Sequence, residues 1–267
     1  MPRRFAPIKK EQLMKHSFTL SQLIPRPGRF GSALAGLALL AMAASSSWGQ
    51  VLPPSSLPYG LSYQEWSAKW WQFYYSQSTD NMSSLGSPDI CAEPASRVVF
   101  LGGEPASTTK TNRVTILAGT PLFFSILAVE TDNTACPTNS FTTNSADALT
   151  SEAIGEWEGA ATVTTCTIDG VAVPGLDSPT NTIYNVVSAP FSYTTAEKNN
   201  VVAVATGDPC LPGGLTVYPT VADGVYLMVA PLAPGRHTIH YIGVAGPLSA
   251  PFLVLDITYD ITVIPLR

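Results

Sequence analysis

The sequence predicts a mainly all-β protein, an antiparallel β-sandwich resembling a jelly roll, with one N-terminal aromatic helix and one short inserted helix. From residue 97 onward, hydrophobic and polar residues alternate with the period of two that is typical of half-buried strands. Short β-branched runs recur about every ten to fifteen residues and are separated by Gly, Pro and Asn turns. Residues 65–77, EWSAKWWQFYYSQ, instead repeat aromatic side chains at helical spacing.

Residues 1–49 have the features of a secretory signal peptide. Scattered basic residues precede the uncharged apolar run GSALAGLALLAMAA, and the small and polar residues SSSWGQ follow it. We expect cleavage near Gly49, with cleavage after Ala43 or Ala44 as the alternative, and Met14 is an alternative start. The apolar run is short for a bilayer-spanning helix. The sequence therefore predicts a secreted or periplasmic protein without a membrane span after cleavage.

The chain that remains after cleavage is strongly acidic. Of 14 Lys and Arg and 19 Asp and Glu residues, seven basic residues and one acidic residue lie in the signal segment, which leaves a net charge near −11. A surface of this sign repels polyanions, so we expect no nucleic-acid partner. Neither a glycine-rich phosphate loop nor another cofactor motif is present, so we expect no cofactor.

Residues 50–61 are proline-rich and predict an extended lead-in to a single domain over 62–267. Ser62 and Glu65 have the spacing of a capping box, which predicts a helix over 62–77. The side chains at three- and four-residue steps share one face and are expected to pack on the sheet: Tyr63, Trp66, Trp70, Phe73 and Tyr74. Trp71 and Tyr75 lie beside this stripe and are the candidates for ligand contact.

Strand signals follow along the rest of the chain. They cover residues 97–101, 112–117, 120–129, 162–168, 171–173, 182–187, 201–206, 224–232, 236–243 and 252–264. The last run alternates most regularly, with one apolar and one mostly polar face. Asp169-Gly170 predicts a two-residue hairpin turn, because both residues tolerate positive φ. The second helix is expected over 145–159.

Four cysteines follow the signal segment: Cys91, Cys136, Cys166 and Cys210. An even number of cysteines in an exported chain favours two disulfides, and the sequence leaves all three pairings open. None of the four forms a C-x-x-C pair, which argues against a zinc or redox site.

The polar residues offer few candidates for a catalytic or metal site. Glu130, Asp132 and Asn133 place oxygen ligands close together in a predicted loop and suggest calcium, with a solvated acidic turn as the alternative. His237 and His240 are three residues apart on a predicted strand, so they point to opposite faces and do not readily share a metal. His237 is expected to be a hydrogen-bonded residue at the start of its strand.

Several motifs together resemble a family of uncharacterised secreted bacterial proteins. These are the signal peptide, EWxxKWWQF, RVVFLGG, TIDGVAV, ADGVYLMVAPLAPGRHTIHY and the terminal DITYDITV. The resemblance covers most of the chain from Ser62 to Val263 and implies an exported β-rich domain. It brings no established activity and no functional residues.

The sequence favours a non-enzymatic binding module at the cell surface or outside the cell, with a carbohydrate or an envelope protein as partner. Few charges and many Ser, Thr and Asn residues on the expected outer faces support this interpretation. A polysaccharide-acting hydrolase, with carboxylates brought together by the fold, is one alternative. A structural subunit of an envelope or extracellular assembly is the other.

Overall fold

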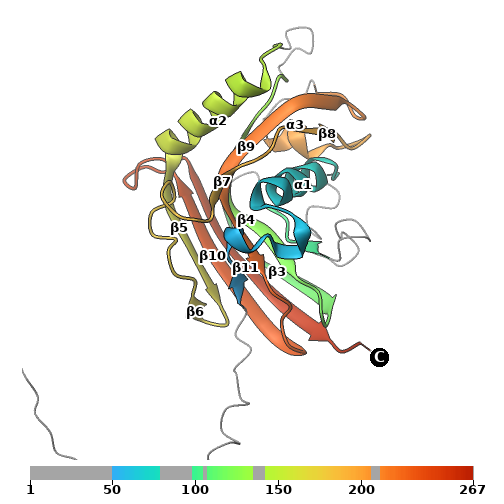
Figure 1. Ribbon diagram of the computed structural model, residues 1–267, viewed down its shortest axis with the longest axis vertical. Coiled ribbons are helices and arrows are strands. Elements are labelled where there is room, and N and C mark those ends of the chain that lie inside the picture. The colour runs from blue at the N-terminus through green and yellow to red at the C-terminus, as the bar shows by residue number, and fades with distance from the viewer. Residues whose placement is uncertain (1–49, 79–97, 105–106, 135–141, 206–210, 267) are drawn as a thin grey trace, which may run out of the picture. The chain divides into compact units, whose positions relative to one another are not determined.

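Two β-sheets and three α-helices make up the part of the chain that the structure, a computed structural model, describes (Figure 1). This part comprises residues 50–78, 98–104, 107–134, 142–205 and 211–266. The predicted signal peptide and its cleavage site lie outside these residues. The mainly all-β, sandwich-like architecture that the sequence predicts is confirmed.

The first sheet is built around the longest described strand, β9. Its strands run in the order β1 (Val51–Leu52), β9 (Thr216–Val229), β4 (Leu122–Thr131) and β2 (Val99–Phe100), and β7 (Asn185–Val187) and β8 (Phe191–Thr194) also pair with β9. The predictions did not include β8 as a strand. They also placed the start of β9 eight residues too late.

The second sheet has the strand order β3 (Thr108–Leu117), β11 (Leu253–Ile264), β10 (Gly235–Ala245), β5 (Ala161–Ile168) and β6 (Val171–Ala172). The pairs β3–β11 and β2–β4 are parallel, whereas the other pairs in both sheets are antiparallel. The expected antiparallel sandwich is thus modified at two places. In each sheet, the parallel partner is an edge strand.

Three helices lie among these strands: α1 (Tyr63–Tyr75), α2 (Ala146–Ala160) and α3 (Val201–Ala205). The capping box forms as predicted, because Ser62 N–H donates to Glu65 Oε2 (2.8 Å) and Ser62 Oγ accepts from Glu65 N–H (3.3 Å). The predicted strand over 201–206 is wrong, since α3 begins there. The side chain of Asn200 accepts from the Ala203 N–H and so caps this short helix.

The lead-in is less extended than the sequence predicts. It contains strand β1 and two 3-10 turns, η1 (Pro54–Ser56) and η2 (Pro58–Gly60). The second turn lies against α1, because its Pro58 carbonyl accepts a 2.9 Å hydrogen bond from Trp66 Nε1. The lead-in therefore anchors the start of the aromatic helix.

The first sheet is covered on both faces. On one face Phe123 packs edge-on against Tyr63 of α1, with ring centroids 5.6 Å apart. On the other face the adjacent Phe124 stacks at 5.5 Å on Tyr241 of the second sheet. Because neighbouring residues of a strand point to opposite faces, α1, the first sheet and the second sheet form three successive layers (Figure 1). None of the helices in the described segments is long and apolar enough to cross a membrane.

Candidate functional site

A cavity of about 240 Å³ lies beside the edge of β4, where α1, β4 and the second sheet come together. The strand β2 pairs with β4 only at Leu122 and Phe123, so within the described residues the rest of this edge has no neighbouring strand. The cavity is lined by Trp70, Trp71, Tyr74, Tyr75, Gly103, Glu104, Ser125–Ala128, Glu130, Tyr241, Leu253 and Leu255. The lining therefore combines aromatic and aliphatic side chains with two carboxyl groups.

The aromatic wall comes from one side of α1. Trp70 stacks on Tyr74 with centroids 5.1 Å apart, and Trp71 stands perpendicular to Trp70 at the same centroid distance. The indole N–H groups are directed elsewhere, with Trp70 donating to the Leu101 carbonyl (2.8 Å) and Trp71 to the Tyr226 hydroxyl (2.7 Å). The ring carbons of the two tryptophans, and not their N–H groups, are therefore available to line the cavity.

Trp71 and Tyr75, the predicted candidates for ligand contact, are both buried in the structure. Only 7% and 4% of their surfaces are exposed. Both are nevertheless part of the candidate site, because they line the cavity. Tyr75 also donates a 2.7 Å hydrogen bond to Oε2 of Glu130, which joins two residues that the sequence analysis had assigned to separate sites.

Glu130 is the principal polar group of the cavity. Its Oε1 is buried and has no hydrogen-bond partner within the described residues. Burial raises the pKa of this carboxyl well above its usual range, and the negative charges of Asp132 and Glu156 raise it further, while the Tyr75 hydrogen bond lowers it. Glu130 therefore retains its proton at pH values where an exposed glutamate has lost it.

Two further polar groups face the same space. The Tyr74 hydroxyl is buried without a hydrogen-bond partner in the described chain, and burial together with the nearby Glu104 charge raises its pKa. Glu104 forms a 2.6 Å ion pair with Lys110. Glu130 and Tyr74 thus remain the two buried lining groups whose hydrogen-bonding capacity is not filled by this part of the protein.

The predicted calcium ligands do not converge on one point. Glu130 lies in β4 rather than in a loop. Asp132 accepts hydrogen bonds from the backbone and hydroxyl of Thr134 and from Tyr193, and Asn133 binds the segment that leads into α2. No group of three or more His, Cys, Asp or Glu side chains in the described ranges is arranged to hold a metal ion. The calcium interpretation therefore has no geometric support.

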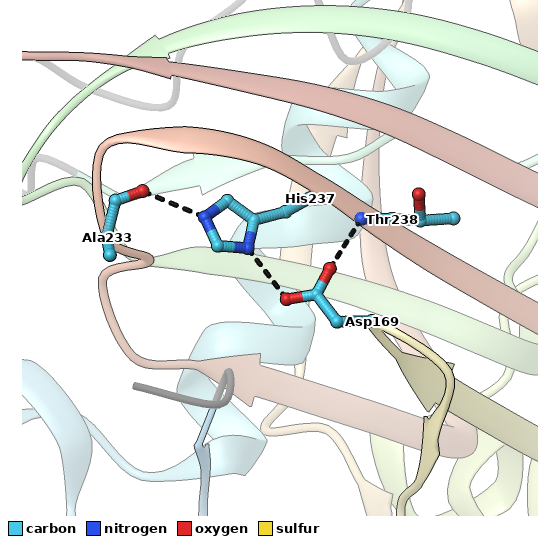
Figure 2. Close-up of polar contacts among 4 residues, drawn as sticks. All are labelled: Asp169, Ala233, His237 and Thr238. Atoms are coloured by element: carbon cyan, nitrogen blue, oxygen red, sulfur yellow. Dashed lines mark hydrogen bonds and ion pairs between the residues drawn. The ribbon is translucent and has the colours of Figure 1, made fainter. Parts of the chain in front are cut away.

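His237 is a hydrogen-bonded residue at the start of its strand, as predicted. Its Nδ1 lies 2.7 Å from Oδ2 of Asp169, in the predicted Asp169-Gly170 turn, and its Nε2 lies 2.8 Å from the Ala233 carbonyl (Figure 2). Asp169 also accepts the Thr238 N–H at 2.8 Å. Both ring nitrogens are engaged, so neither is free to act as a general base. His240 instead pairs with Asp256 at 2.8 Å.

Cys166 has a free, buried thiol, so its predicted participation in a disulfide is wrong. It is only 3% exposed on the inner side of β5, and burial raises its pKa to about 12. The other candidates, Cys91, Cys136 and Cys210, lie outside the described residues.

No protein-family model matches the chain, and no curated protein matches it significantly. Two solved structures show weak similarity. "Structure of PbICP-C in complex with falcipain-2" is 13% identical, with a TM-score of 0.25 over 62% of this chain and 98% of that chain. "Solution Structure of Amebosin" is 8% identical, with a TM-score of 0.19 over 59% and 98% of the two chains. At these TM-scores neither similarity bears on the function.

Proposed function

We propose that the protein is a non-enzymatic binding module whose cavity takes a small organic cation of the quaternary ammonium type. The observation that carries this proposal is an aromatic-walled cavity that contains a buried carboxyl with no cationic partner among the described residues. Two tryptophans and three tyrosines line it together with Glu130. The faces of aromatic rings attract cations, and this attraction is strongest where water is excluded.

The charge of the site favours a cation over an anion or a neutral ligand. Within the described part of the chain, no positively charged side chain contributes to the shift of the Glu130 pKa. Lys110, which is not among the lining residues, is paired with the lining Glu104. An anionic ligand would meet two carboxyl groups, whereas a cation would gain an ionised Glu130 as its counter-ion.

The size of the cavity favours a compact ligand. Pockets for drug-sized molecules have volumes of roughly 300–1,000 Å³, and this one has about 240 Å³. A trimethylammonium group with a short substituent fits this space. A long acyl chain does not.

Binding must displace the proton of Glu130. The ligand cation replaces that proton as the partner of the carboxylate, so each binding event releases about one proton to solvent below the pKa of the free site. Affinity should consequently rise about tenfold per pH unit in this range. The hydroxyl of Tyr75 stays in place as a hydrogen-bond donor to the ionised carboxylate.

Calorimetric titration with choline chloride tests the proposal. Titrations in two buffers of different ionisation enthalpy measure the number of protons released. The neutral carbon isostere 3,3-dimethyl-1-butanol is the ligand control. Glu130→Gln should abolish choline binding, whereas Glu152→Gln, on the exposed side of α2, should leave it unchanged. Equal binding of choline and its isostere, or no binding of choline, would overturn the proposal.

The same cavity also fits a second function, hydrolysis of a glycosidic bond. One observation favours it: Glu130, whose pKa is raised by burial, and the ion-paired Glu104 line one ring-walled space. Glycosidases use one protonated carboxyl as the acid and one carboxylate as the base or nucleophile. A panel of nitrophenyl glycosides tests this function, and turnover should disappear in both Glu130→Gln and Glu104→Gln. Choline binding without turnover of any glycoside would leave only the first function.

A further inference from the structure

A second groove, of about 340 Å³, lies where the end of β4 meets the start of β9. It is lined by Asn133, Thr134, Thr142, Thr143, Asn144 and Leu215–Pro219. None of these described lining residues is charged, and six of them are Thr or Asn. The groove shares no lining residue with the Glu130 cavity. It therefore differs from that cavity in chemistry as well as in position.

Tyr218 contributes a large exposed ring to this groove. It is 67% exposed, whereas its neighbour Val217 and the following Thr220 are buried. The register between β8 and β9 shifts here, since Tyr193 pairs with Val217 but Phe191 pairs with Thr220. β9 thus carries one residue more than β8 at this point. Such β-bulges redirect side chains and are frequent beside functional sites.

The opposite wall is held in shape by Asn133, which is 9% exposed. Its Oδ1 accepts hydrogen bonds from the Asn144 N–H (2.7 Å) and the Thr142 hydroxyl (2.8 Å), and its Nδ2 donates to the Asn144 carbonyl (3.0 Å). The side chains of Thr143 and Asn144 are exposed and have no side-chain hydrogen bond to the described residues. They are therefore available to a ligand.

We infer that this groove is a binding site for a neutral glycan. A sugar ring has one face rich in C–H groups, which packs on an exposed aromatic ring, and its hydroxyls pair with amide and hydroxyl groups at the edge. Tyr218 supplies the ring, and Thr143, Asn144 and Thr216 supply the polar groups. Since the described lining carries no cation to pair with a carboxylate or sulfate, the glycan is a neutral one.

This inference does not depend on the cation site. Its test is affinity electrophoresis of the full chain in gels that contain one soluble polysaccharide each. The neutral probes are hydroxyethylcellulose, xylan, galactomannan, glucomannan and laminarin, and the anionic probes are alginate and polygalacturonate. We expect retardation by at least one neutral probe, by neither anionic probe, and with little change on addition of salt.

Substitutions test whether binding of the polysaccharide depends on the ring of Tyr218. Tyr218→Ala should weaken the retarding interaction about tenfold, as is common for an aromatic residue central to a site. Tyr218→Phe should retain it. Tyr59→Ala removes another exposed tyrosine, 47% exposed and away from the groove, and should change nothing. Glu130→Gln, the variant expected to lose choline binding, should also bind the neutral polysaccharide normally.

Two results would overturn the inference. One is the absence of retardation by every neutral probe. The other is retardation that Tyr218→Ala leaves unchanged, which would place the glycan elsewhere. Thermal melting of Tyr218→Ala and Tyr218→Phe shows whether both variants are folded, and the Phe variant keeps the test valid if the Ala variant is not.

Discussion

Tyr75 of α1 donates a 2.7 Å hydrogen bond to Oε2 of Glu130 in β4. Tyr193 of β8 packs against the Tyr75 ring at a centroid distance of 4.7 Å and donates its own hydroxyl to Asp132. Two tyrosines thus each donate to one of two neighbouring acids. Glu130 differs from Asp132 because its second oxygen is buried without a partner among the described residues. This difference makes Glu130 the residue that a ligand can satisfy.

Glu130→Gln should stabilise the unliganded protein at neutral pH. The pKa of Glu130 is raised in the folded state above its ordinary value near 4.5. The folded protein therefore holds more protons, and the contribution of this group to stability is complete below pH 4.5 and is lost as pH rises through the folded-state pKa. Glutamine resembles the protonated acid and has no charge to desolvate. We expect a gain of about 1–2 kcal/mol at pH 7–8.

Melting temperatures of wild type and Glu130→Gln between pH 4 and pH 8 check this prediction. The difference should be small at pH 4 and should grow with pH. If Glu130→Gln is more stable than the wild type and yet fails to bind choline, Glu130 serves ligand binding and not the stability of the fold. A loss of stability that grows as pH rises would mean that the charged form of Glu130 supports the fold, contrary to the prediction.

The sequence predicts α1 well because the information is local. The cap at Ser62 and the spacing of the aromatic stripe define both the helix and its buried face. The degree to which Trp71 and Tyr75 are buried could not be predicted, because it depends on how many neighbouring elements surround the helix. Here β8 extends the contact beyond the stripe, as the packing of Tyr75 against Tyr193 shows.

The cavity itself could not be predicted, because its walls are distant in sequence. The order of the strands in the sheets brings together lining residues that are far apart in the sequence: Glu104, Glu130, Tyr241 and Leu253. The parallel pairing of β3 with β11, for example, joins one strand near the start of the described chain to another near its end. Glu104 follows two glycines, a local sign of close backbone approach. Without knowledge of the partner strand, however, nothing connects it to Glu130. The Tyr218 groove was missed for a similar reason, since a bulge is defined by the register of two strands.

Asp169→Ala should destabilise the protein by about 2–3 kcal/mol. The substitution leaves the Thr238 N–H and the His237 Nδ1 without their acceptor, and it places alanine at φ 51°. Asp169→Asn should cost less, because asparagine tolerates positive φ and its amide oxygen still accepts from Thr238. Chemical denaturation measures both free energies of unfolding.

The matched comparison is Asp256→Ala, which removes the more exposed His240–Asp256 pair. A half-exposed ion pair contributes about 0–1 kcal/mol, so this change should be mild. Equal losses at Asp169 and Asp256 would show that the lower exposure and the turn conformation of Asp169 add nothing to stability.

Cys166 should resist alkylation by iodoacetamide in the native protein at pH 8. Burial limits access of the reagent, and a pKa of about 12 keeps the sulfur in its unreactive thiol form. After unfolding in guanidinium chloride, the peptide that carries Cys166 should be modified fully, which also shows that the reagent is active. Peptide mapping by mass spectrometry under non-reducing conditions gives the measurement. A disulfide-linked Cys166 peptide in that map would contradict the prediction.

Gly243→Ala and Gly155→Ala should change stability in opposite directions. Gly243 lies on β10 where the second sheet approaches β4, and a Cβ at this position would stand 2.6 Å from the Ile126 carbonyl oxygen. Backbone atoms on both sheets would have to move, so we expect a loss of about 1–3 kcal/mol. Gly155 lies within α2 with no atom within 4 Å of an added Cβ, and alanine there should stabilise the helix by about 0.5–1 kcal/mol. Urea denaturation of both variants measures the pair. Two losses of equal size would mean that the close approach of β10 to β4 does not require glycine.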